Sequence, residues 1–126
     1  MLDSQQWLAS GDQDCLIKIW TIGDNTSLIT TLEGHTGYVT SLVNLRKGHM
    51  ASASEDRTIK IWNYDNLEYG VALLATLRGH ADKVMDLTLL FDGNLASASW
   101  DGTVNIWNLH AIYNYPNRSI LIPVDL

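Results

Sequence analysis

The stretch MASASEDRTIKIW at residues 50–62 decides the fold, because it recurs without a gap as LASGDQDCLIKIW at 8–20 and as LASASWDGTVNIW at 95–107. The closing tryptophans are spaced 42 and 45 residues apart. A second block, LEGHTGYVTSL at 32–42, recurs as LRGHADKVMDL at 77–87, and in both complete units a histidine precedes the tryptophan by 27 residues. A repeat of this length indicates copies of one small unit that stack on one another.

Each unit predicts antiparallel β-strands. Short runs rich in Ile, Val, Leu and Thr alternate with Gly- and Asp-containing turns at the spacing of hairpins. In the second unit, the expected strands lie at residues 39–45, 50–54 and 58–63. A further strand is expected after each tryptophan, at 27–32, around 71–77 and, by its apolar pattern, in the tail at 119–126.

The repeat length, the Gly-His pair and the closing tryptophan resemble WD40 repeats over residues 8–109. The resemblance implies an all-β fold of β-propeller blades, each a four-stranded antiparallel sheet, arranged around a central channel. We expect an incomplete propeller of about three blades that forms a single region over residues 1–126. The blades are expected at 7–32, which is partial, at 33–77 and at 78–126. Each tryptophan is followed by Thr or Asn where the family usually has Asp, at a position that varies in the family.

The resemblance also implies a buried polar quartet in each complete blade: the histidine of the Gly-His pair, a strand serine, a turn aspartate and the tryptophan. The two expected quartets are His35, Ser52, Asp56 and Trp62, and His80, Ser97, Asp101 and Trp107. Buried indole and imidazole N–H groups need acceptors, which serine and aspartate supply. Ser54 and Ser99 lie on the same strand faces, so either serine of each strand fits the pattern. A His–Asp–Ser set is also typical of a hydrolase triad, but its recurrence in successive units favours a structural role.

The first unit is incomplete at its start. It lacks the Gly-His pair and the innermost strand, and it keeps only Ser10, Asp14 and Trp20 of a quartet. Because blades bury their faces against neighbouring blades, an arc of three leaves apolar faces and strand edges open. Two hypotheses follow: the chain belongs to a longer propeller, or copies of it form a homo-oligomer that closes the ring.

Composition and charge argue against several classes of function. The net charge of −6 disfavours a nucleic-acid partner, since phosphate binding needs a cationic footprint. No apolar run approaches the ~20 residues that span a bilayer, and the N-terminus does not resemble a signal peptide. With the single cysteine, Cys15, these features predict an intracellular protein without a membrane partner. Nucleotide-binding motifs and metal-ligand spacings are absent from the sequence, so we expect no cofactor and no metal, with His49 and His110 in loops.

We therefore predict a non-enzymatic scaffold that binds a protein or peptide partner. Propellers of this family generally bind partners on the rim of the channel, where the matching positions are Trp100, Tyr38, Lys83, Glu55 and Gln13. Trp100 is the sharpest candidate, because a turn tryptophan has no obvious core role and exposed tryptophans are enriched as interface anchors. The alternatives are a targeting or regulatory segment of a longer multi-domain protein, such as a kinase or ubiquitin-ligase subunit, and a self-assembling propeller ring.

Overall fold

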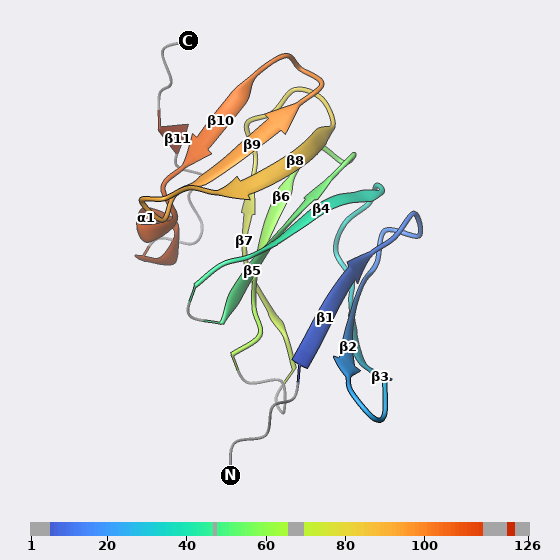
Figure 1. Cartoon of the computed structure of the whole chain (residues 1–126). Coiled ribbons are helices and arrows are strands. Elements are labelled where there is room, and N and C mark those ends of the chain that lie inside the picture. The colour runs from blue at the N-terminus through green and yellow to red at the C-terminus, as the bar shows by residue number, and fades with distance from the viewer. Residues whose placement is uncertain (1–5, 47, 66–69, 115–120, 123–126) are drawn as a thin grey trace.

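Three antiparallel sheets stand side by side in the structure, a computed structural model that describes residues 6–46, 48–65, 70–114 and 121–122 (Figure 1). The first sheet contains β1 (Gln6–Gly11), β2 (Ile17–Ile22) and β3 (Ser27–Leu32). The second contains β4 (Val39–Asn44), β5 (His49–Ser54), β6 (Ile59–Asn63) and β7 (Ala72–Leu77). The third contains β8 (Val84–Leu89), β9 (Leu95–Ser99), β10 (Val104–Trp107) and β11 (Leu121–Ile122). The predicted all-β arrangement of about three blades is confirmed.

The middle sheet is covered on both faces, which sets the burial of its strands. β5 and β6 are buried along nearly their whole length, whereas β1 in the first sheet is largely exposed. One apolar core lies between the first and second sheets and includes Ile17, Ile19, Leu32, Met50 and Trp62. A larger core lies between the second and third sheets and includes Ile59, Ile61, Leu77, Leu95 and Trp107. Each of these tryptophans therefore packs against the sheet that precedes its own.

The turn after each repeated aspartate places one residue in the left-handed region of the backbone. Cys15, Arg57 and Gly102 occupy equivalent positions in the three repeats, with φ of 71°, 75° and 84°. This conformation is free of steric cost only for glycine, so the first two turns carry backbone strain that the third avoids. The shared geometry shows that the repeat dictates the turn even where the residue does not suit it.

The tail contributes the fourth strand of the third sheet. β11 pairs antiparallel with β10, and Ile122 lies opposite Ile106. In the first sheet Ile19 lies opposite Thr30 in the same way, but the register then differs: Trp107 lies opposite Leu121, whereas Trp20 lies opposite Leu28 after a bulge between Ile19 and Trp20. The rest of the strand expected at 119–126 lies outside the described residues.

A short helix, α1 (Leu109–Asn114), follows the last tryptophan strand and has no counterpart in the sequence prediction. Its residues Leu109 and Ile112 are buried in the core between the second and third sheets. Its Tyr113 stacks on His49, with ring centroids 4.6 Å apart. The expectation that His49 and His110 lie in loops is wrong, because His49 begins β5 and His110 lies in α1.

Candidate functional site

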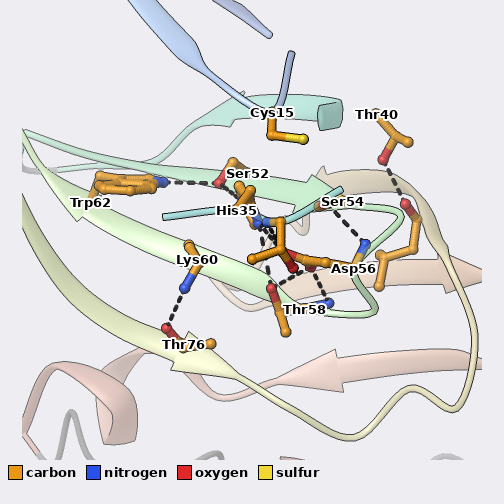
Figure 2. Close-up of polar contacts among 12 residues, drawn as sticks. Cys15, His35, Thr40, Ser52, Ser54, Asp56, Thr58, Lys60, Trp62 and Thr76 are labelled. Carbon is orange, nitrogen blue, oxygen red and sulfur yellow. Dashed lines mark hydrogen bonds and ion pairs between the residues drawn. The ribbon is translucent and has the colours of Figure 1, made fainter. Parts of the chain in front are cut away.

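A buried polar quartet links β5, β6 and the turn between them to the segment before β4 in the second sheet, as Figure 2 shows. His35 Nδ1 lies 2.8 Å from Asp56 Oδ2, and His35 Nε2 lies 2.7 Å from Ser52 Oγ. The indole N–H of Trp62 donates to the same Ser52 oxygen at 2.9 Å. Because a carboxylate can only accept, Nδ1 of His35 donates to Asp56, and in the neutral imidazole Nε2 accepts the serine proton. The result is one continuous chain of hydrogen bonds from the turn aspartate to the tryptophan.

The third sheet contains the same quartet with nearly the same geometry. His80 lies 2.8 Å from Asp101 through Nδ1 and 2.7 Å from Ser97 through Nε2. The Trp107 indole donates to Ser97 Oγ at 2.8 Å. In both sheets the structure selects the first of the two candidate serines.

The second serine of each strand instead fixes the turn. Ser54 Oγ accepts the Asp56 backbone N–H at 3.0 Å, and Ser99 Oγ accepts the Asp101 N–H at 3.0 Å. Both serines therefore act in the network, one at the imidazole and one at the aspartate backbone.

Both turn aspartates are held ionised by donors that surround them. Burial by itself raises the pKa of the Asp56 carboxyl, but hydrogen bonds from His35, Thr58 and the Thr36 amide outweigh it and hold this pKa well below its ordinary value. The pKa of Asp101 is likewise lowered: burial opposes the shift, and bonds from Thr103, the Ala81 amide and His80 outweigh it. A charged acceptor strengthens each bond it receives.

The quartets are unsuited to hydrolysis. Ser52 is fully buried, and Ser97 is 1% exposed. Each serine oxygen already accepts an indole N–H, and a nucleophile must instead face a substrate. The described residues also hold no cluster of three or more His, Cys, Asp or Glu that could bind a metal ion.

The first sheet holds only part of a quartet. The Trp20 indole donates to Ser10 Oγ at 2.9 Å. Asp14 Oδ1 accepts the Leu16 N–H at 3.1 Å, and its Oδ2 lies 3.8 Å from Lys18 Nζ. Neither Ser10 nor Asp14 contacts a histidine among the residues that the structure describes.

Three of the five rim candidates, Trp100, Lys83 and Glu55, form one cluster at the surface across two sheets, in which Trp100 is exposed and the other two are half-buried. Lys83 Nζ lies 4.8 Å from the centroid of the Trp100 ring and 3.4 Å from Glu55 Oε2. The Trp100 side chain remains 64% exposed, so the lysine positions it without covering it. Tyr38 is also exposed, and its carbonyl accepts the Glu55 N–H at 2.9 Å. Gln13 is exposed in the turn between β1 and β2 and is not part of this cluster.

Sequence reasoning missed an apolar cavity of about 410 Å³ between the first and second sheets. Trp7, Leu42, Met50 and Tyr64 are among the residues that line it. The rings of Trp7 and Tyr64 meet edge to face, with centroids 6.4 Å apart. Trp7 and Tyr64 lie outside the repeated pattern, and these two aromatic residues were the sequence signal that could have indicated the cavity.

Three antiparallel sheets pack face to face, and two of them contain a buried hydrogen-bond network of the same kind, which defines a segment of a β-propeller. The family model described as WD domain, G-beta repeat matches residues 2–21, 26–63 and 72–108. The chain therefore belongs to the WD40 repeat family.

Similar proteins carry the same repeat. DDB1- and CUL4-associated factor 13 of Dictyostelium discoideum is 44% identical over 63 residues, which cover 49% of this chain and 14% of that protein. Protein transport protein sec13 of Aspergillus oryzae is 38% identical over 68 residues, which cover 48% of this chain and 23% of that protein. The solved structure of U3-55K matches with a TM-score of 0.69 and 35% identity, over 80% of this chain and 30% of that one. The chain thus spans less than a third of each of these proteins.

No helix among the described residues is long and apolar enough to cross a membrane.

Proposed function

We propose that this chain is a non-catalytic scaffold that binds a protein or peptide partner through the surface cluster of Trp100, Lys83 and Glu55 and through the exposed Tyr38 beside it. The observation that carries the proposal is the large exposed indole of Trp100, held by a cation on its ring. A tryptophan fixed in place loses little side-chain freedom when a partner covers it, which is typical of interface anchors. Gln13 lies apart from this cluster and would contact only a partner that extends over the first sheet.

The turn also fixes the Trp100 backbone. Its N–H donates to the Lys83 carbonyl at 3.0 Å, and the next residue, Asp101, anchors the buried quartet. The indole is therefore displayed from a rigid support. Anchors of this kind contribute ~2 kcal/mol or more to binding, which corresponds to roughly 30-fold in affinity.

A phage-displayed library of random peptides, selected on the purified chain, provides ligands for the test. We expect Trp100→Ala to weaken the selected peptides by about 30-fold or more, with an unchanged melting curve. Phe91→Ala is the matched control, because Phe91 is 94% exposed and lies in the turn at the other end of β9. Equal losses for the two variants, or no loss for Trp100→Ala, would contradict the proposal.

The partner that we propose is a protein or peptide in an intracellular compartment, without nucleic acid or membrane. Support comes from the net charge of −6 and from the free thiol of Cys15. The Dictyostelium relative is named as a factor associated with other proteins, which fits a binding role. Because the chain spans 14% and 23% of the two relatives, a targeting segment of a longer multi-domain protein, such as a kinase or ubiquitin-ligase subunit, is the alternative.

Self-assembly into a homo-oligomeric ring is a second candidate, favoured by the outer faces of the arc. Val104 in the third sheet is 41% exposed, whereas its repeat equivalent Ile59 in the middle sheet is fully buried. Leu8 in the first sheet is 52% exposed, against 4% for its equivalent Met50. Neighbouring blades would cover both faces. Light scattering on the purified chain tests this candidate, and a monomer mass at all concentrations would exclude it.

A further inference from the structure

Lys83 occupies a small cation site that two neighbouring sheets build together. Its ammonium lies 4.8 Å from the centroid of the Trp100 ring, which belongs to the turn after β9 of the third sheet. The same nitrogen lies 3.4 Å from Oε2 of Glu55, in the turn after β5 of the second sheet. An aromatic face beside a carboxylate is a combination that attracts ammonium and guanidinium groups. The contact therefore indicates which ligands these two side chains accept.

Lys83 is a weak occupant of this site. Its distance of 3.4 Å from Glu55 exceeds the about 2.7–2.9 Å of a good charge-assisted hydrogen bond. The Lys83 side chain is 36% exposed, so its ammonium can turn into water without opening the fold. Lys60, in contrast, is 7% exposed, and its ammonium donates to Thr76 Oγ1 at 3.0 Å within the second sheet. Of these two lysines, only Lys83 can leave its position at little cost.

The charges around the site favour a further cation over an anion. The rim segments are the turns after β1, β5 and β9, at 12–16, 55–58 and 100–103, and the segments before β4 and β8, at 33–38 and 78–83. Histidines aside, they hold seven carboxylates but only three cations, which are Arg57, Arg78 and Lys83. A basic partner is attracted to such a surface, and an acidic one is repelled.

We propose that the partner of the surface cluster is a basic segment, and that one of its arginines takes the place of Lys83 between Trp100 and Glu55. The inference rests on the proposed function, because it names the partner chemistry of the same site. A guanidinium is planar, so it can stack on the indole while its N–H groups donate to both oxygens of the carboxylate. The compact ammonium of Lys83 meets these two requirements only in part, and arginine therefore displaces it.

Lys83 acts as an internal competitor in this mechanism. In the free chain it keeps Trp100 in position and neutralises Glu55, so the site stays organised without a partner. On binding, the indole and the carboxylate exchange one cation for another, and the released lysine side chain regains rotational freedom. Removing the ammonium should therefore strengthen the binding of an arginine, whereas the loss of a lysine that contacts the partner directly would weaken it.

Two phage-displayed peptide libraries provide the probes. Their random positions exclude arginine and lysine, and their fixed central residue is arginine in one library and leucine in the other. Both are selected on the purified chain in roughly 0.15 M salt, which screens long-range attraction. We expect the arginine library to yield peptides whose binding is lost with Trp100→Ala, and the leucine library to yield none.

Fluorescence anisotropy then measures a labelled peptide from the arginine library. Replacing its arginine by leucine should weaken binding by about tenfold or more, because the charge-assisted hydrogen bonds are lost. Replacing it by lysine should weaken binding by about threefold, because an ammonium cannot both stack on the indole and donate in parallel to the carboxylate.

Variants of the chain separate the roles of its two charged residues. Glu55→Gln should weaken the arginine peptide by about tenfold, and it should cost little more when the peptide's arginine is replaced as well. Lys83→Met, which keeps the apolar stem and removes the ammonium, should strengthen binding by about threefold. The matched controls Glu33→Gln and Arg57→Met remove equal charges from exposed positions of the rim segments and should change affinity by less than about twofold.

Three results would overturn the inference: equal yields of Trp100-dependent peptides from the two libraries, no loss with Glu55→Gln, or unchanged or weaker binding of the arginine peptide with Lys83→Met. All three leave the proposed function intact, since binding still depends on Trp100. The inference alone also fails if an unrestricted library yields Trp100-dependent peptides and the arginine library does not. If no library yields such peptides, the proposed function fails as well.

Discussion

Replacing Asp101 by alanine removes the acceptor on which the third sheet's quartet depends. The carboxylate accepts four hydrogen bonds: from His80 Nδ1 at 2.8 Å, from the Ala81 N–H at 3.0 Å, and from the Thr103 N–H and hydroxyl at 2.8 and 2.6 Å. Ala81 and Thr103 are exposed, so water can replace the lost acceptor there. The His80 side chain is fully buried, so its N–H loses its charged acceptor and keeps only a weak contact with the Thr103 hydroxyl, 3.4 Å away.

The expected loss in the free energy of unfolding follows from this difference in burial between the donors. A buried donor without an acceptor costs about 1–3 kcal/mol, and each exposed bond contributes less than a typical net value of about 1 kcal/mol. We therefore expect Asp101→Ala to lower the free energy of unfolding by about 2–4 kcal/mol. For a chain of this size, the corresponding drop in Tm is on the order of 10 °C.

Urea unfolding followed by tryptophan fluorescence measures this change. Asp92→Ala is the matched control, because Asp92 also caps a turn, accepting the Asn94 N–H at 3.0 Å, but lies exposed. The control is expected to cost less than about 1 kcal/mol. A free energy of unfolding for Asp101→Ala equal to that of Asp92→Ala would refute the assignment of Asp101 to the buried quartet.

Three further predictions concern acid, turns and packing. The folded-state pKa values of Asp56 and Asp101 are lowered, so the stabilisation that these carboxylates supply is present above the unfolded-state pKa of about 3.9 and is lost as the pH falls below it. Replacing both aspartates by asparagine should therefore reduce the change in the urea unfolding midpoint between pH 5 and 2.5. Arg57→Gly should stabilise by roughly 0.5–1 kcal/mol, and Gly102→Ala should destabilise by about 1 kcal/mol, in thermal melts. Ile59→Ala should lower the free energy of unfolding by about 2–4 kcal/mol, and the equivalent Val104→Ala should lower it by less than about 1 kcal/mol. Equal losses would show that the outer face of the third sheet is covered.

The repeat made the sheets and the quartet residues predictable, because each strand and each buried polar group recurs at a fixed spacing. The choice of Ser52 over Ser54 was not predictable, since both lie on one strand face and only the position of the imidazole separates them. α1 was missed because it falls outside the repeated pattern, in a segment too short to show helical periodicity. The contact of Lys83 with both Glu55 and Trp100 depends on how two sheets are placed, which the spacing of residues within one repeat does not encode.

Trp100 and Asp101 are adjacent in the chain, yet their side chains meet opposite environments. The indole is 64% exposed, whereas the Asp101 carboxylate is 10% exposed and bonded to a buried histidine. Trp100→Ala should therefore change the free energy of unfolding by less than about 0.5 kcal/mol, as for surface residues in general, while reducing partner binding. Asp101→Ala should lower stability strongly. Weaker partner binding by this variant below its melting temperature would mean that the loosened turn misplaces the Trp100 indole. A stability loss for Trp100→Ala as large as that for Asp101→Ala, measured side by side in urea, would show that the tryptophan supports the fold rather than a partner.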